Sequence, residues 1–254
     1  LQQEASKRLG FNPTRTMQVA QKLYEGIDSQ KIEGGLITYM RTDGVQIEDN
    51  VINEIRSNIE VNFGTEQVPQ NKNIYHTKSK NAQESHEAIR PTSISNAPED
   101  IRPHISDEQF KLYELIWKRT MASQMANAKF ERTSIAIKAI DNLGQNNLFR
   151  ASGEHRLKAG YQVLFDDKPN DGAEKDFNEE KLSNQNVFGM EENESISCKK
   201  LTDNAHDTEP PPRFNPASLI KLLEDLGIGR PSTYASILSV LTERNYTKLE
   251  QKRF

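Results

Sequence analysis

Residues 35–44, Gly-Leu-Ile-Thr-Tyr-Met-Arg-Thr-Asp-Gly, set a phenol two positions before a guanidinium in a run typical of a β-strand. Successive strand side chains point to opposite faces, so a strand over 36–42 would place Tyr39 and Arg41 on one face. Arginine carries a permanent charge whose fork matches phosphate oxygens, and a tyrosine phenol can form a covalent ester with phosphorus. The pair favours chemistry on a phosphodiester. The alternative is that Tyr39 only packs, as most strand tyrosines do.

Helical patterns flank this run. A helix is expected from Pro13 up to Gly26, because an asparagine and a proline precede an apolar stripe and a glycine follows it. Apolar residues at helical spacing predict a second helix over 51–59. Ser106, with a glutamine three positions later, predicts a capping box that opens a long third helix. We therefore expect a helix-rich, winged-helix-like domain over residues 1–126, which carries the tyrosine.

The pattern changes after residue 126. Alternating residues predict short strands over 134–140, 148–151, 161–165 and 195–201, and hence a partial antiparallel β arch over 127–212. Within it, residues 166–194 hold ten acidic and three basic side chains, which predicts a solvated loop.

After a triple proline at 210–212, the last segment of the chain, 213–254, reads as a small helical domain. Asn215 and Pro216 predict one helix, Pro231 a second, and residues 246–249 the start of a hairpin. The whole chain is therefore predicted to be a multidomain α+β protein.

Two further clusters can hold phosphate. Gly227-Ile228-Gly229-Arg230-Pro231-Ser232-Thr233 combines glycines, a predicted helix start with free amides and a positive charge. The alternative is a tight connection between two helices. His86 and Arg90, four positions apart, would share a face if their segment were helical. The alternative there is a salt bridge from Arg90 to Glu87 or Glu84.

Composition narrows the classes of function. The chain has 254 residues, a net charge of −4 and a mean hydropathy of −0.79, which favour no particular partner. Its one cysteine, Cys198, excludes an internal disulfide and a multi-cysteine zinc site. No apolar run is long enough for a membrane span, no acidic cluster has metal-ligand spacing, and no Walker lysine follows a glycine loop. Because the chain opens on Leu1 within a helical pattern, we expect a fragment of a longer cytoplasmic protein.

Five blocks of sequence, taken together and in this order, resemble bacterial type IA DNA topoisomerase I. They are residues 1–6, 16–25, 37–43, 86–91 and 213–235. The resemblance implies that Tyr39 is the nucleophile that forms a 5′-phosphotyrosyl link with one DNA strand, and that Arg41 positions the phosphate. It also implies DNA-binding roles for seven residues: His86, Arg90, Gln21, Glu25, Arg230, Thr233 and Arg244.

The same resemblance implies relaxation of supercoiled DNA by transient cleavage of one strand, without ATP, in the cytoplasm at the nucleoid. Mg²⁺ would be bound by an N-terminal domain that is not in this chain, and C-terminal zinc modules are also missing. We therefore expect the chain alone not to relax DNA, and its incomplete sheet to expose edges that favour self-association.

Two other functions remain open. One is a stand-alone DNA-binding clamp in which Tyr39 is structural. The other is a tyrosine-dependent nicking or replication-initiation enzyme, although that class needs metal-binding histidines and the five here form no tight cluster.

Overall fold

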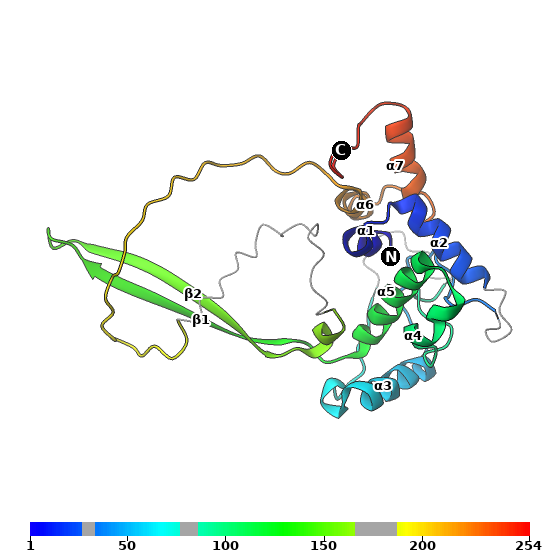
Figure 1. Cartoon of the computed structure of the whole chain (residues 1–254), viewed down its shortest axis with the longest axis horizontal. Coiled ribbons are helices and arrows are strands. Elements are labelled where there is room, and N and C mark those ends of the chain that lie inside the picture. The colour runs from blue at the N-terminus through cyan, green and yellow to red at the C-terminus, as the bar shows by residue number, and fades with distance from the viewer. Residues whose placement is uncertain (27–33, 77–85, 166–186) are drawn as a thin grey trace. The chain divides into compact units, whose positions relative to one another are not determined.

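The structure is a computed structural model that describes residues 1–26, 34–76, 86–165 and 187–254. Within these ranges helices dominate and the strands form one antiparallel pair, which confirms the predicted α+β class (Figure 1). The α-helices are α1 (Gln2–Leu9), α2 (Pro13–Glu25), α3 (Asp49–Phe63), α4 (Pro98–Ile101), α5 (Asp107–Gln124), α6 (Pro216–Asp225) and α7 (Tyr234–Glu243). The strands are β1 (Lys129–Ile140) and β2 (Asn146–Lys158), and the 3-10 helices are η1 (Thr65–Gln67), η2 (Arg102–His104) and η3 (Gly160–Leu164). No described helix is long and apolar enough to cross a membrane.

Two compact units divide the described residues. The first unit contains residues 1–126, 161–165 and 212–254 where they are described, and the second contains 127–160 and 187–211. Residues 213–254, predicted as a separate part, lie in the first unit and contact it through α6 on α1 and α7 on α2. Compactness in one conformation does not define which parts fold independently, so the three-domain division stays a prediction.

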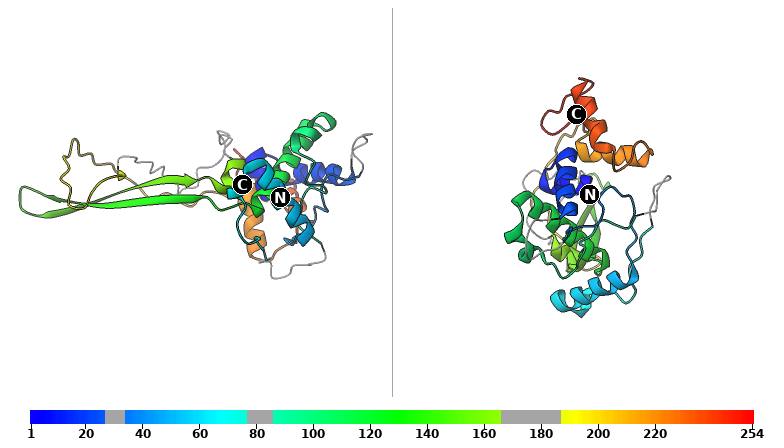
Figure 2. Two further views of the ribbon diagram at one scale, coloured as in Figure 1. Left: turned by 90° about the horizontal axis from the view of Figure 1, so that it is seen from below. Right: turned by 90° about the vertical axis from the view of Figure 1, so that its right-hand side faces the viewer.

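The first unit is built on α5, which serves two hydrophobic cores. One core packs α1, α2 and α5 around buried residues that include Leu23, Leu36 and Tyr113, and Figure 2 shows the blue helices beside α5. The other core packs α3 and α5 around residues that include Trp117 and Leu164. Burial raises the pKa of the Tyr113 phenol, whose hydroxyl donates to the carbonyl of Asn96 over 2.7 Å. The long helix predicted from its capping box is thus the centre of this unit.

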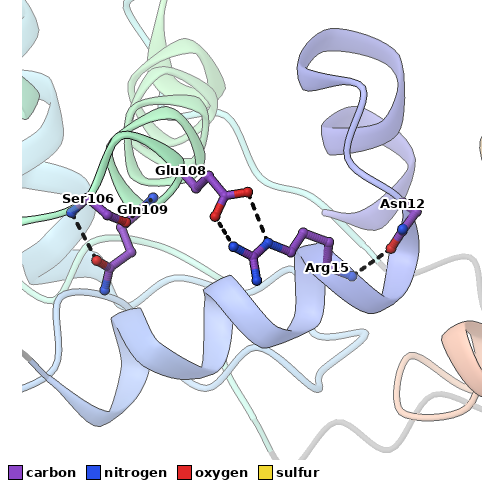
Figure 3. A network of polar contacts seen from close by, with 5 residues as sticks. All are labelled: Asn12, Arg15, Ser106, Glu108 and Gln109. Atoms are coloured by element: carbon purple, nitrogen blue, oxygen red, sulfur yellow. Dashed lines mark hydrogen bonds and ion pairs between the residues drawn. The ribbon is translucent and has the colours of Figure 1, made fainter.

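Local caps fix where α2 and α5 begin. The Asn12 side chain accepts a hydrogen bond from the Arg15 amide over 2.7 Å, and Pro13 occupies the first turn. In Figure 3 the guanidinium of Arg15 then reaches α5 and binds both carboxylate oxygens of Glu108, with its Nε at 3.0 Å. These contacts tie the first turn of α2 to the first turn of α5. Both predicted helix starts are confirmed.

The capping box of α5 supplies a stability prediction. The Gln109 amide donates to Ser106 Oγ over 3.3 Å, and the Ser106 amide donates to Gln109 Oε1 over 3.0 Å (Figure 3). We expect Ser106→Ala to lower the free energy of unfolding by about 1 kcal/mol, because an amide in the first turn loses its acceptor. Urea unfolding followed by circular dichroism measures this. The control is Ser106→Asp, which keeps an acceptor and is expected to retain most of the stability.

The second unit is an antiparallel hairpin. Residues pair from Lys129 with Lys158 to Ile140 with Asn146, and the turn is held by Asp141, whose carboxylate accepts from the amides of Leu143 and Gln145. The predicted strands 134–140 and 148–151 therefore lie within longer β1 and β2. Both members of a two-stranded sheet are edge strands, so the predicted exposure of edges holds for this pair.

Two other predicted strands are wrong. Residues 161–165 begin instead as η3, because Gly160 has a φ of 51° that ends the extended run and Leu164 packs into the core with α3 and α5. Residues 195–201 have no regular structure, and no strand among the described residues pairs with them or covers their exposed side chains. Of the acidic loop predicted at 166–194, residues 166–186 lie outside the described ranges.

The last helices differ from prediction in their ends. Asn215 and Ser218 form a capping box on α6, as the asparagine and proline suggested. However, α7 begins at Tyr234, not Pro231, because the amides of Thr233 and Tyr234 both donate to the Arg230 carbonyl and close a turn first. In place of the predicted hairpin after residue 246, a single bridge joins Glu250 and Arg253.

Candidate functional site

The run around Tyr39 is not a strand. Ile37 makes one isolated bridge with Pro91, and the chain on either side of it is irregular. The run is tied down by contacts with distant segments, since Leu36 donates to the Leu23 carbonyl and Thr38 donates to the Arg90 carbonyl. Pro91 has no amide to extend the pairing. The predicted common strand face for Tyr39 and Arg41 is therefore wrong, although both lie on one loop.

Tyr39 itself is half-buried between aromatic neighbours. Its ring meets the Tyr24 ring edge-on, with centroids 5.5 Å apart and planes at 68°. The His86 ring lies 5.0 Å away and is tilted by 54°. Within the described part of the chain, the Tyr39 hydroxyl forms no hydrogen bond, so its oxygen is available to a ligand. Aromatic contacts thus position the Tyr39 ring, while no hydrogen bond among the described residues fixes its hydroxyl.

Arg41 is exposed two positions further along the loop. No ion pair or hydrogen bond within the described residues engages its guanidinium. An exposed, uncommitted arginine beside a phenol with a free oxygen can bind an anionic group presented from solvent. The pair predicted from the sequence thus lies on one irregular loop and not on one face of a strand.

His86 and Arg90 do not share a helix face, because residues 86–91 form no helix. His86 is exposed and packs on Tyr39, whereas Arg90 is buried. The Arg90 Nε donates to a Glu87 carboxylate oxygen over 2.8 Å, and its Nη1 donates to the Pro91 carbonyl over 2.9 Å. The alternative salt bridge to Glu87 is therefore confirmed. Of the two residues, only His86 faces the site.

Arg90 gives a second stability prediction. Its side chain is 10% exposed, so its two acceptors lose a charged donor in a shielded place if it is replaced. We expect Arg90→Met to lower the free energy of unfolding by about 1–3 kcal/mol, measured by urea denaturation. The control is Glu87→Gln, which keeps an acceptor for Arg90 and is expected to cost less. Equal stability of Arg90→Met and the unmodified chain would contradict this structural role.

Two glycines allow the loop to approach its supports. A Cβ added to Gly35 would lie 2.1 Å from the Tyr24 carbonyl oxygen, and one added to Gly44 would lie 2.1 Å from the His86 carbonyl oxygen. The Thr38 hydroxyl fastens the centre of the loop by donating to the Ala88 carbonyl over 2.7 Å. The loop is therefore pinned at both ends and in the middle, on the two segments that supply the neighbouring rings.

Gln21 and Glu25 lie one turn apart near the C-terminal end of α2. The Gln21 amide nitrogen donates to Glu25 Oε1 over 2.7 Å. Tyr24 lies between them in sequence and joins this end of the helix to Tyr39. We did not expect a role for Tyr24 from the sequence, in which it looks like part of the apolar stripe of α2. The sequence feature that could have pointed to Tyr24 is its position between Gln21 and Glu25, two residues already expected to lie near the site.

Nearby backbone and side-chain oxygens accept from most amides of the turn at residues 227–233. Carbonyls of α6 accept from the amides of Gly227 and Ile228, the Arg230 carbonyl accepts from those of Thr233 and Tyr234, and the Thr233 hydroxyl accepts from the Arg230 amide. A Cβ on Gly229, whose φ is 76°, would lie 2.9 Å from the Ile237 side chain. The turn is a tight connection between α6 and α7, as the alternative expected. Thr233, the N-cap of α7, makes no side-chain hydrogen bond to the helix amides, so a phosphate site at this helix start stays a prediction. The charged group of this turn is the guanidinium of Arg230, whose Nη1 donates to the Gly229 carbonyl over 2.7 Å.

Electrostatics link this turn with the Tyr39 loop. Burial raises the pKa of the Tyr234 phenol, Glu224 raises it further, and Arg230 opposes them, while Asp43 adds a smaller increase. Asp43 and Arg230 therefore both lie within electrostatic reach of one hydroxyl at the start of α7. Arg244 is different: it is exposed at the far end of α7, roughly 15 Å along the helix from that start.

A metal site is a separate question. Among the described residues, no group of three or more histidine, cysteine, aspartate or glutamate side chains could hold an ion.

Comparisons with known proteins agree along the whole chain. The family model for DNA topoisomerase matches residues 1–254. The DNA topoisomerase 1 of Rickettsia felis is 46% identical over 254 residues, covering 100% of this chain and 31% of the relative. That of Xylella fastidiosa (strain Temecula1) is 45% identical over 256 residues, covering 100% of this chain and 30% of the relative. The full-length topoisomerase I of Thermotoga maritima superposes with a TM-score of 0.71 at 32% identity, over 99% of this chain and 38% of that one. The chain thus spans about a third of the length of these relatives.

Proposed function

The chain belongs to the DNA topoisomerase family, and from this premise we propose that it supplies the DNA-cleaving tyrosine of a type IA enzyme. The observation that carries the proposal is the state of Tyr39, whose ring is held by two aromatic neighbours while its hydroxyl has no partner among the described residues. A tyrosine that only packs usually gives its hydroxyl a hydrogen-bond partner or turns it toward bulk solvent. The Tyr39 loop differs, because it also carries Arg41, an arginine that makes no ion pair or hydrogen bond among the described residues.

The proposed step is a transesterification. The Tyr39 oxygen attacks phosphorus, the bond from phosphorus to the 3′ oxygen breaks, and a tyrosyl ester of the 5′ phosphate forms. The phenol loses its proton and the departing 3′ oxygen gains one, so no proton is consumed overall. The new ester retains the energy of the original diester, and the 3′ hydroxyl can reverse the attack without ATP. Strand passage before reversal relaxes supercoiled DNA.

The charge of Arg41 and the ring contact of His86 support helper roles for both residues. The exposed Arg41 guanidinium can neutralise the charge that grows on the non-bridging phosphate oxygens. His86 can hold the DNA next to the nucleophile, since it already touches the Tyr39 ring. For binding of the single strand we propose Gln21, Glu25, Arg230, Thr233 and Arg244, while the contacts of Arg90 favour a structural role.

The complete activity needs parts that these residues do not provide. We propose that the ligands of Mg²⁺ belong to residues outside this chain, and that the chain alone does not relax DNA. The proposal has four further parts. The Tyr39 region is winged-helix-like, and the hairpin belongs to a β arch. The chain self-associates through the edges of the hairpin, and the protein acts at the nucleoid in the cytoplasm.

A chimera tests the function. This chain replaces the matching segment of the Rickettsia felis relative, and the chimera is incubated with Mg²⁺ and an oligonucleotide before denaturation. Because the proposed link is to the 5′ phosphate, a 3′-end label is expected to travel with the protein and a 5′-end label is not. The unaltered relative is the control. A folded chimera that shifts DNA on a native gel without any adduct would favour the binding clamp instead.

A further inference from the structure

We propose that Tyr24 is a positioning residue for Tyr39: it fixes the ring so that the phenol oxygen points in one direction. This inference rests on the proposed function, but part of its test does not. Tyr24 acts through another side chain, and it needs no contact with DNA.

The first support is what Tyr24 contacts. Within the described part of the chain, its side chain has one specific interaction, the edge-on contact with Tyr39 at 5.5 Å. It is 40% exposed, and no hydrogen bond of its hydroxyl anchors it elsewhere. A core residue of α2 such as Leu23, by contrast, is fully buried. Tyr24 thus contributes little to the core beneath α2, and its large ring is explained by the neighbour that it touches.

The second support is that the backbone sets the distance between the two rings. The Leu36 amide donates to the Leu23 carbonyl over 2.7 Å, one residue from Tyr24. The next carbonyl, that of Tyr24, lies so close to Gly35 that no Cβ fits between them. The start of the Tyr39 loop is therefore packed directly against the backbone of the residue that carries the second ring.

The third support is the shape of the resulting enclosure. Tyr39 has two rotatable side-chain bonds, and a single neighbour leaves its ring free to swing away from that neighbour. Tyr24 from α2 and His86 from another segment together restrict both bonds. In-line attack on phosphorus tolerates little misplacement of the oxygen, so loss of one restraint lowers the rate of cleavage more than the affinity for DNA.

The test compares Tyr24→Leu with Tyr24→Phe, because phenylalanine keeps the ring and removes only the hydroxyl. The first measurement uses this chain alone, with ¹³C-labelled tyrosine rings followed by NMR and Tyr39 assigned by its loss in Tyr39→Phe. We expect Tyr24→Leu to shift and narrow the Tyr39 ring signals, and Tyr24→Phe to leave them within the wild-type pattern. Signals of the buried Tyr113 report whether the fold is intact.

The second measurement uses the chimera. We expect Tyr24→Leu to slow adduct formation about tenfold at saturating DNA with little change in Kd, and Tyr24→Phe to stay within about twofold of the unmodified rate. Unchanged Tyr39 signals in Tyr24→Leu would overturn the inference whatever the chimera does. A higher Kd with an unchanged rate would also overturn it, because Tyr24 would then be a DNA contact. If the signals respond as expected but no variant makes an adduct, the proposed function fails while the positioning of the ring stands.

Discussion

Tyr39→Phe is expected to abolish the covalent DNA adduct of the chimera, with a loss of at least about a thousandfold. Phenylalanine keeps the ring contacts with Tyr24 and His86 and lacks only the oxygen that attacks phosphorus. That oxygen has no hydrogen bond among the described residues, so the free energy of unfolding is expected to change by less than about 0.5 kcal/mol. The measurement is the transfer of a 3′-end label to protein after denaturation.

The matched control is Tyr246→Phe, which removes the hydroxyl of a tyrosine that is 67% exposed. Its adduct yield is expected to equal that of the unmodified chimera. Native-gel binding of the oligonucleotide should survive in both variants, because neither loses a positive charge. An adduct that persists in Tyr39→Phe would show that another side chain is the nucleophile.

Gly35→Ala is expected to lower the free energy of unfolding by about 2–4 kcal/mol. Its Cβ would lie 2.1 Å from the Tyr24 carbonyl oxygen, which is a backbone atom of α2 and cannot rotate away. The loop must then separate from α2, which also breaks the hydrogen bond from Leu36 to Leu23. Urea unfolding of the chain alone measures the cost, and the adduct yield of the chimera is expected to fall with it.

The neighbouring glycine is the control. Gly34 has a φ of 79° and open space around its Cβ position, so Gly34→Ala meets only the strain of a left-handed backbone. That strain costs about 1–2 kcal/mol, less than the expected effect at Gly35. If the two substitutions cost the same, close contact with α2 is not what makes Gly35 necessary.

Helices were predictable because their signals are local. Asn12 with Pro13, Ser106 with Gln109, and Asn215 each satisfy amides within one turn, and the structure has a helix start at all three places. The strand predicted at 36–42 is wrong, because the amides of Leu36 and Thr38 bond to carbonyls far along the chain and the run makes only one isolated bridge. A strand-like sequence pattern indicates that a segment suits an extended, half-buried backbone, but it does not indicate which segment its amides and carbonyls bond to.

The site was predictable to a similar extent. Tyr39 and Arg41 could be named from the sequence because each residue type carries its chemistry in one side chain and they stand two positions apart, while their roles stay a prediction. For Arg90 the sequence left two interpretations open, a phosphate contact and a salt bridge to a nearby glutamate. The structure has the salt bridge, to Glu87 three positions away. Tyr24 was missed because an aromatic residue in an amphipathic helix predicts packing, and only the structure shows on which side it packs.

The ties on the Tyr39 loop also bear on how the molecule folds. Thr38 bonds to Ala88 and Arg90 across separations of 50 and 52 residues, whereas α2 and α5 can form from contacts within a few turns. Closing a segment of that length costs chain entropy before any of its bonds is gained, so such contacts form slowly and late. The helices are therefore expected to fold before the Tyr39 loop. The phenol reaches its place only when distant parts of the chain have met, so a partly folded chain would have the helices but not the reactive site.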